Sequence, residues 1–186
     1  MDKNTPYYIS SEYYPRDYQG SKDFHNGIDM SPKVKNFIEK QSGSGLIAVG
    51  DVPKVYSAAA GIVKARGFDD INGGGWWVKI DLFEQIDGKP VQLIYMHLNV
   101  GLQDDGSSIC VENGQIVKAG DPIADMGGTG IKVKIGNDGE MQSTTRSSGV
   151  HLHFEVRTFV SKEDYNRNKY TTVNPRLHFN LRVYNK

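Results

Sequence analysis

The sequence has little cysteine, no surplus of charge of one sign and no long apolar run. Cys110 is the single cysteine among 186 residues, which excludes an intramolecular disulfide and a thiolate metal cluster. Lys and Arg number 22, as do Asp and Glu, so the net charge is zero and a nucleic-acid binder that neutralises phosphates is disfavoured. The mean hydropathy is −0.51 and no apolar run approaches the roughly 18 residues of a membrane span, so we expect a soluble chain.

The first residues also lack a targeting signal. Residues 1–8 show neither the basic start nor the apolar stretch of a secretory signal peptide. Either the protein is not exported by such a signal, or the signal has been removed from this chain.

Turn residues and short apolar runs indicate β structure. Residues 77–82 largely alternate between apolar and polar, Asp87-Gly88 is typical of a tight hairpin turn, and residues 91–98 supply the partner strand. Helical signals are few: Ser31-Pro32 predicts a helix that ends near Ser42, and residues 161–168 predict one more short turn of helix. Further strands are expected within 52–66, at 116–117 and 122–123, and over 150–160. We therefore predict one all-β domain over residues 1–186, with a lead-in over residues 1–20 and with loop and short helical insertions.

The strongest local signal is the pair His151 and His153. On a strand, residues two apart share a face, so both imidazoles point the same way while Leu152, Phe154 and Val156 fill the opposite face. Neutral imidazole is a good zinc ligand. Taken alone, however, the pair is equally well explained by two solvated histidines on a strand.

Two further histidine patterns are weaker on their own. His25 and Asp29 are four residues apart with Gly27 between them, so they can converge across a turn. An ordinary turn in which Asp29 accepts hydrogen bonds from backbone amides explains the same spacing. His97 ends the return strand of the expected hairpin, where strand parity gives it the face of Tyr95, and a buried histidine bonded to a carbonyl is the simpler interpretation.

Together the three patterns predict a metal site. Two nitrogen ligands and one carboxylate would form a three-ligand zinc site whose fourth position stays open for water, the arrangement of catalytic zinc. The carboxylate of Asp29 lowers the net charge of such a site to about +1, and two histidines remain beside the metal for proton transfer.

The chain resembles the lysostaphin/LytM-type zinc metallopeptidases, which cut peptide bonds in bacterial peptidoglycan. The resemblance extends from about Arg16 to Phe179 and rests on the order and spacing of several blocks. These blocks are residues 25–29 (HNGID), 55–63 (VYSAAAGIV), 95–98 (YMHL), 113–123 (NGQIVKAGDPI), 127–130 (GGTG), 151–155 (HLHFE) and 173–175 (VNP). The family resemblance implies a β-sandwich-like antiparallel sheet with a groove bounded by loops, which agrees with the all-β pattern.

The resemblance also implies a role for each key residue. His25, Asp29 and His153 would hold one Zn2+ ion per chain, and His151 and His97 would form the catalytic pair. The ion would lower the pKa of a bound water toward about 7. His151 is then the candidate that accepts the water proton and passes it to the leaving amine. His97 would hydrogen-bond the water or the developing oxyanion, and the two roles can be shared or exchanged.

Other side chains near these motifs have two interpretations each. Glu155 is a second candidate base or, alternatively, an outer or rim ion-pair partner, because it lies two residues farther from the metal. Tyr95, Trp76 and Trp77 line the groove or pack in the core. His178 shows no partner in the sequence and is taken as structural.

Several positions depart from the family pattern. Met96, the pair Trp76-Trp77, and Asp125 replace residues usual in the family, and the segments 31–51, 101–112 and 131–146 are longer than in minimal members. The latter two segments are polar or glycine-rich and are expected as loops. None of these departures changes any of the five key residues. Insertions that form the walls of the groove would affect substrate preference.

The implied function is a zinc-dependent endopeptidase that acts on the peptide part of peptidoglycan, in the cell envelope or as a secreted protein. Its target is either a glycyl-glycine bond of a cross-bridge or a stem-peptide link. One alternative is a non-catalytic scaffold or regulator of cell-wall hydrolases with the same fold, which the presence of all five residues disfavours. Another is a phage virion-associated lysin with the same chemistry, which fits the absence of an export signal from this chain.

Overall fold

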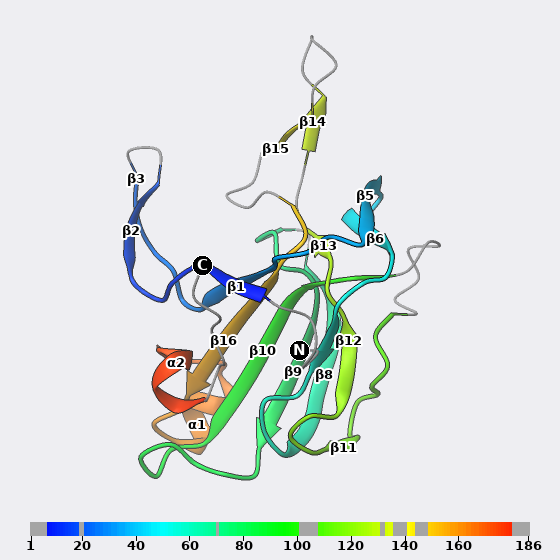
Figure 1. The fold of residues 1–186 in the computed structure, drawn as a ribbon. Coiled ribbons are helices and arrows are strands. Elements are labelled where there is room, and N and C mark those ends of the chain that lie inside the picture. Colours follow the sequence, from blue (N-terminus) through cyan, green and yellow to red (C-terminus); the bar gives the residue numbers. More distant parts are fainter. Residues whose placement is uncertain are drawn as a thin grey trace.

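The central feature of the fold is an antiparallel β-sheet of eight strands, seen in a computed structural model that describes residues 7–18, 21–69, 71–100, 108–130, 133–135, 141–143 and 149–179 (Figure 1). Seven strands are neighbours in the order β1 (Tyr7–Ser11), β4 (Ile28–Pro32), β16 (Leu152–Thr158), β10 (Val91–Leu98), β9 (Gly75–Leu82), β8 (Gly61–Asp69) and β11 (Ile116–Val117). The eighth, β17 (Thr171–Val173), pairs with β16. The all-β antiparallel fold expected from the sequence is therefore confirmed.

Smaller sheets and two short helices surround the central sheet. The pairs are β7 (Lys54–Tyr56) with β12 (Pro122–Asp125), β2 (Pro15–Tyr18) with β3 (Ser21–Phe24), and β14 (Val133–Ile135) with β15 (Met141–Ser143). A three-stranded sheet contains β5 (Phe37–Ser42), β6 (Gly45–Gly50) and β13 (Gly128–Thr129). The helices are α1 (Lys162–Asn166) and α2 (Pro175–His178). Within the described part of the chain, neither helix is long and apolar enough to cross a membrane.

The hairpins and helices lie at opposite ends of the central sheet. Figure 1 shows β2–β3, β5–β6 and β14–β15 projecting at the end where β10 finishes and β16 begins, whereas α1 and α2 lie toward the other end. His151 and His153 lie at the start of β16. The projecting hairpins therefore surround the end of the sheet that carries the key histidines.

The two faces of the central sheet differ in polarity. Ile80, Leu93 and Val156 are register partners on three adjacent strands, and all three are fully buried in the core. The adjacent register rows on the opposite face are mostly polar: one is Asp81, Gln92 and Arg157, and the other is Lys79, Ile94 and Glu155. Because side chains alternate between faces, one sequence pattern builds an apolar core beneath the sheet and a polar layer above it.

The predicted helix after Pro32 is wrong. Strand β4 runs through Pro32, and residues 37–42 form β5, which pairs with β6. The apolar spacing was misleading because Phe37 is buried whereas Val34 and Ile38 are 51% and 58% exposed, so these side chains share no buried face. Pairing with the apolar strand β6 supplies the backbone hydrogen bonds that a helix would otherwise make.

The described residues of the other insertions also differ from the expected loops. The segment 131–146 was expected as a loop, but its described residues form the hairpin β14–β15. In 101–112, residues 101–107 lie outside the described residues, and Ile109 and Val111 are buried in the core. The predicted hairpin of β9 and β10 and the short helix after residue 161 are confirmed, with Asp87 and Gly88 both at positive φ in the turn.

Tyr95 provides a test of the core. Its side chain is 2% exposed, its hydroxyl accepts a hydrogen bond from the Ala58 backbone N–H at 2.9 Å, and burial raises its pKa. We expect Tyr95→Phe to lower the free energy of unfolding by about 1 kcal/mol, because the amide loses its partner. Urea denaturation measures the change. The exposed Tyr14→Phe is the control, and equal stabilities for the two variants would contradict the packing described.

Candidate metal centre

Backbone pairing brings Asp29 and His153 together although 124 positions separate them. The two residues are direct partners across the β4–β16 ladder, flanked by the pairs Leu152 with Met30 and Phe154 with Ile28. Side chains directly opposite each other on an antiparallel pair share a face, with Cβ atoms about 4.5–5.5 Å apart. Their flanking neighbours are buried on the other face. The core residues therefore fix the register that aligns the carboxylate with the imidazole.

His25 joins them from the segment just before β4. Its backbone N–H donates to the Tyr14 carbonyl at 3.1 Å, which ties it to the preceding turn. Gly27 then passes so close to β16 that an added Cβ would lie 2.4 Å from the Phe154 carbonyl oxygen. Only glycine allows this approach, which positions the His25 ring over the Asp29–His153 pair.

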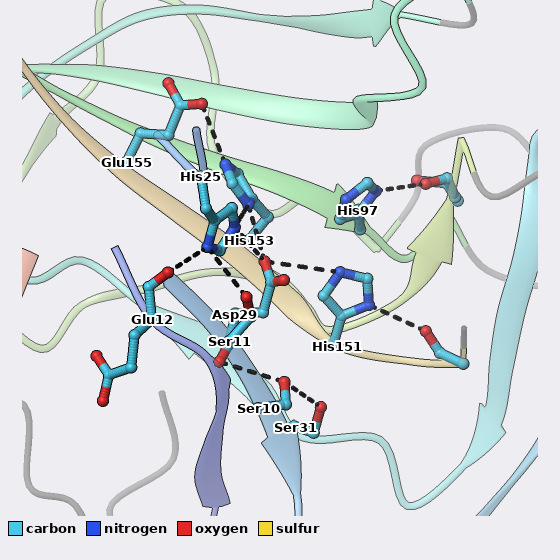
Figure 2. A network of polar contacts seen from close by, with 12 residues as sticks. Ser10, Ser11, Glu12, His25, Asp29, Ser31, His97, His151, His153 and Glu155 are labelled. Atoms are coloured by element: carbon cyan, nitrogen blue, oxygen red, sulfur yellow. Dashed lines mark hydrogen bonds and ion pairs between the residues drawn. The ribbon is translucent and has the colours of Figure 1, made fainter. Parts of the chain in front are cut away.

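The three side chains converge on a common point. Asp29 Oδ1 lies 3.2 Å from His25 Nε2 and 2.8 Å from His153 Nδ1, and the two ring nitrogens lie 3.1 Å apart (Figure 2). His25 is buried, and Asp29 and His153 are partly buried. His25, Asp29 and His153 therefore lie together, as the sequence led us to expect.

The outer nitrogen of each ring has its own acceptor. His25 Nδ1 lies 2.7 Å from the Glu12 carbonyl, and His153 Nε2 lies 3.1 Å from Glu155 Oε1. A carbonyl can only accept, so the proton of a neutral His25 is on Nδ1 and its Nε2 presents a lone pair to Asp29. In the same way, a proton on Nε2 of His153 leaves Nδ1 facing the carboxylate.

This donor set fits a zinc ion. Two imidazole nitrogens and one carboxylate oxygen are ordinary zinc ligands, and they leave a fourth tetrahedral position open. Three acceptor atoms this close together repel one another unless a proton or a cation lies among them. The outer hydrogen bonds to Glu12 and Glu155 are the kind that orient metal-binding histidines.

Without a metal, the cluster shares protons. Although burial alone would raise the pKa of Asp29, its polar contacts with the rings of His153 and His25 hold it well below its usual range. Burial would lower the pKa of His153, but its hydrogen bonds to Asp29 and Glu155 raise it to about 9. A cation that binds here must therefore displace a proton from His153.

His151 and His97 lie beside this cluster, and Nδ1 of each ring faces a backbone carbonyl. His151 Nδ1 lies 3.0 Å from the Gly149 carbonyl and its Nε2 is 4.0 Å from Asp29 Oδ1. His97 Nδ1 lies 2.9 Å from the Thr129 carbonyl. Both rings therefore have Nε2 as the unprotonated nitrogen when neutral, and their centroids are 4.5 Å apart.

The environment keeps both rings neutral. Burial, followed by the neighbouring His151 and His153, lowers the pKa of His97 to about 3. Burial also lowers the pKa of His151, although the charge of Asp29 opposes the shift. Neutral imidazoles with a fixed N–H and an available lone pair can accept a proton from a group placed between them.

Strand parity predicted the wrong face for His97. Strict alternation gives His97 the face of Tyr95, which is in the core. The β9–β10 register shifts between Tyr95 and Leu98, and His97 has a φ of 60°, in the left-handed region that non-glycine residues rarely adopt. This bulge rotates the imidazole onto the polar face beside His151 and His153.

Glu155 is an outer ion-pair partner of His153 rather than a second base. Its Oε1 contacts His153 Nε2, and its Oε2 accepts from Arg157 Nε at 2.8 Å. Both carboxylate oxygens are therefore engaged away from the open side of the cluster. Although burial would raise the pKa of Glu155, its bonds to His153 and then Arg157 lower it.

The remaining expectations concern side chains outside the cluster. Tyr95 packs in the core, Trp76 packs against it, and His178 lies in α2 without a contact to the cluster among the described residues. The sequence could not reveal the supporting carbonyls of Glu12, Gly149 and Thr129, because a backbone acceptor carries no residue signature. The hydroxyl of Ser11, 3.2 Å from His25 Nδ1, was missed for a similar reason, since isolated serines are common.

The relationship of this chain to known proteins follows from a comparison with protein-family models. The model described as Peptidase family M23 matches residues 39–169. The chain belongs to peptidase family M23. The matched range contains His97, His151 and His153, while His25 and Asp29 precede it. No curated protein is detectably similar to this M23 chain in sequence.

Solved structures share the fold of this M23 chain. The catalytic domain of the antimicrobial peptidase lysostaphin from Staphylococcus simulans is 20% identical, with a TM-score of 0.53 over 94% of this chain and 91% of that one. A variant of the catalytic domain of the prophage-encoded M23 protein EnpA from Enterococcus faecalis is 20% identical, with a TM-score of 0.56 over 95% of each chain. A zinc-containing peptidase from Vibrio cholerae is 24% identical, with a TM-score of 0.53 over 92% of this chain and 37% of that one. At these identities the likeness establishes the fold.

Asp29→Asn tests the ligand set of the M23 chain. The amide keeps the shape of the side chain but removes the negative charge, so zinc affinity should fall by more than the roughly 10–100-fold typical of an outer partner. Equilibrium dialysis followed by metal analysis measures zinc per chain. His178→Ala is the matched control and should keep one zinc ion per chain. Full zinc occupancy and unchanged affinity in Asp29→Asn would show that the cluster is not the metal site.

Glu155→Gln tests the outer hydrogen bond. We expect zinc affinity to fall roughly 10–100-fold, because His153 loses the carboxylate that orients its ring and raises its basicity. Competition with a chromogenic chelator measures the affinity. Glu112→Gln, which changes an exposed carboxylate paired with Arg66, serves as the control. Identical affinities in the two variants would argue against a supporting role for Glu155.

Proposed function

We propose that this chain is a zinc-dependent endopeptidase that hydrolyses a peptide bond in bacterial peptidoglycan. The observation that carries the proposal is the convergence of one carboxylate oxygen and two imidazole nitrogens within 3.2 Å of one another, beside two neutral histidines. Membership of a peptidase family supports the reaction class. The fold shared with a lysostaphin catalytic domain supports the same conclusion.

His25, Asp29 and His153 would hold the ion, which when bound polarises the scissile carbonyl and acidifies an attacking water. Each ligand is already oriented by a second contact or by its strand register, so little rearrangement is needed on binding. The Asp29 carboxylate also faces His151, and it can stabilise the imidazolium that forms when that ring accepts a proton.

His151 and His97 would handle the protons. The Nδ1 proton of His151 is committed to the Gly149 carbonyl, so Nε2 can accept a proton from the attacking water and deliver it to the leaving amine. The Nδ1 proton of His97 is likewise committed to the Thr129 carbonyl. Its N–H cannot reach the substrate, so His97 serves as an acceptor of a water hydrogen bond, or as a donor after Nε2 is protonated.

The substrate and the location are part of the proposal. We infer a peptide of the cell wall, cleaved either at a glycyl-glycine bond of a cross-bridge or at a stem-peptide link, in the cell envelope or outside the cell. Digestion of chemically distinct peptidoglycans followed by mass analysis of the released fragments distinguishes the two bonds. Fragments ending in glycine identify the cross-bridge, whereas fragments split within the stem identify the other bond.

His151→Ala and His97→Ala test the catalytic roles. Both variants should retain one zinc ion per chain yet lose at least about 100-fold in turnover, the usual contribution of a general acid–base group. Release of new amino termini from purified peptidoglycan measures the rate, with His178→Ala as the control. Normal digestion by His151→Ala would refute its role. A zinc-loaded wild-type protein that digests no peptidoglycan would instead favour a non-catalytic scaffold.

A further inference from the structure

A cavity of about 350 Å³, lined by both polar and apolar side chains, lies on the central sheet away from the cluster of His25, Asp29 and His153. Strands β8, β9 and β10 contribute Lys64, Lys79 and Gln92 to its lining. The segment at and after α1 contributes Tyr165, Asn166 and Asn168. The catalytic proposal above assigns no role to any of these side chains.

The cavity opens on the same face of the sheet as the metal cluster. Met96 is the register partner of His153, and two residues along the strand Ile94 pairs with both Glu155 and Lys79. Since residues two apart on a strand share a face, Lys79 and His153 point to the same side. Two residues along the strands (about 7 Å) and two inter-strand steps (about 10 Å) separate their backbones, which gives roughly 12 Å. An extended ligand of three to four residues is long enough to span this separation.

Two cations of this cavity form no ion pair within the described part of the chain. The ammonium of Lys79 lies 4.6 Å from the ring centre of Trp77, and that of Lys64 lies 5.4 Å from the ring centre of Tyr165. No described carboxylate forms an ion pair with either lysine. Burial, followed by the nearby charge of Arg157, lowers the pKa of Lys79, although the charges of Glu155, Asp69 and Asp81 oppose the shift.

One acid beside the cavity is already engaged. Asp81 accepts a hydrogen bond from Gln92 Nε2 at 2.8 Å and another from the Tyr165 hydroxyl. The lining itself contains two ammonium groups and no carboxylate, while Glu155, Asp69 and Asp81 act on Lys79 from farther away. Two ammonium groups beside neutral amides, with these acids in the surroundings, suit a monoanion such as a carboxylate. A dianionic phosphate would be expected to require more cations, and the lining contains no arginine fork.

We propose that this cavity binds a carboxylate of the peptide substrate through Lys79 and Lys64. Because an extended peptide advances about 3.4 Å per residue, the carboxylate lies roughly three to four residues from the bond that is cleaved. This inference rests on the proposed peptidase function. It predicts a preference for peptides that carry a free carboxylate at that distance.

A matched pair of peptides tests the substrate preference. The best soluble peptidoglycan fragment is compared with the same fragment in which that carboxylate is converted to a carboxamide. The wild type should show a KM on the order of tenfold lower for the carboxylate form. Lys79→Gln and the more exposed Lys64→Gln should each reduce or abolish this difference. Lys118→Gln, an equal charge change in the exposed turn between β11 and β12, should preserve it.

A binding measurement separates this inference from the catalytic proposal. Acetate and inorganic phosphate are titrated into the wild type, and the side-chain amide of Gln92 and the indole of Trp77 are followed by NMR. Saturable shifts with acetate that Lys79→Gln abolishes would support the site even if no peptide were cleaved. Equal KM values for the two peptides, no acetate response, or tighter binding of phosphate would each overturn the carboxylate assignment.

Discussion

The arrangement of the site depends on one constraint, which is that a partly buried carboxylate faces two imidazole nitrogens at hydrogen-bond distance. Such a cluster is costly to bury unless positive charge sits within it. Because Glu12 and Glu155 accept from the outer nitrogens of the two rings, the inner nitrogens can release protons without changing orientation. A cation can therefore replace the proton in a site whose geometry already exists.

The sheet supplies that geometry through its register rather than through a dedicated loop. The alternation that buries Leu152 and Phe154 directs His153 to the polar face, and pairing with β4 aligns it with Asp29. His97 is the exception, since it reaches the same face only through a bulge and a left-handed backbone conformation. Strain of this kind persists only where surrounding contacts hold it, here the bond of its ring to the Thr129 carbonyl.

The parts of the structure that the sequence could predict are those governed by short-range rules. Alternation and turn chemistry predicted the β9–β10 hairpin and the shared face of His151 and His153. The fold class followed from the same signals. Ligand chemistry grouped these patterns into one metal site, but choosing His25, Asp29 and His153 as its ligands required the family resemblance, because no local rule relates strands so distant in the chain.

The failures also have physical causes. Apolar residues after Pro32 matched a helical period by chance, and tertiary pairing with β6 determined the strand instead. Parity failed at His97 because a bulge adds a residue without any strong sequence signal. The lysines of the cavity could not be grouped, since Lys64 and Lys79 come together only when β8 pairs with β9.

The charged side chains of β4 and β16 give the polar face a direction. Asp29, His153, Glu155 and Arg157 form a continuous chain of contacts in which each charge has an opposite neighbour. Arg157 ends this chain and stacks 3.9 Å from the ring centre of Tyr170. Beyond it, Lys79 and Lys64 form no ion pair in the described structure and lie over aromatic rings instead, at the end of the face away from His153. If the chain cleaves peptides as proposed, a substrate with one anionic group is favoured in a single orientation along the sheet, because reversal would bring its carboxylate toward Asp29 and remove it from both lysines.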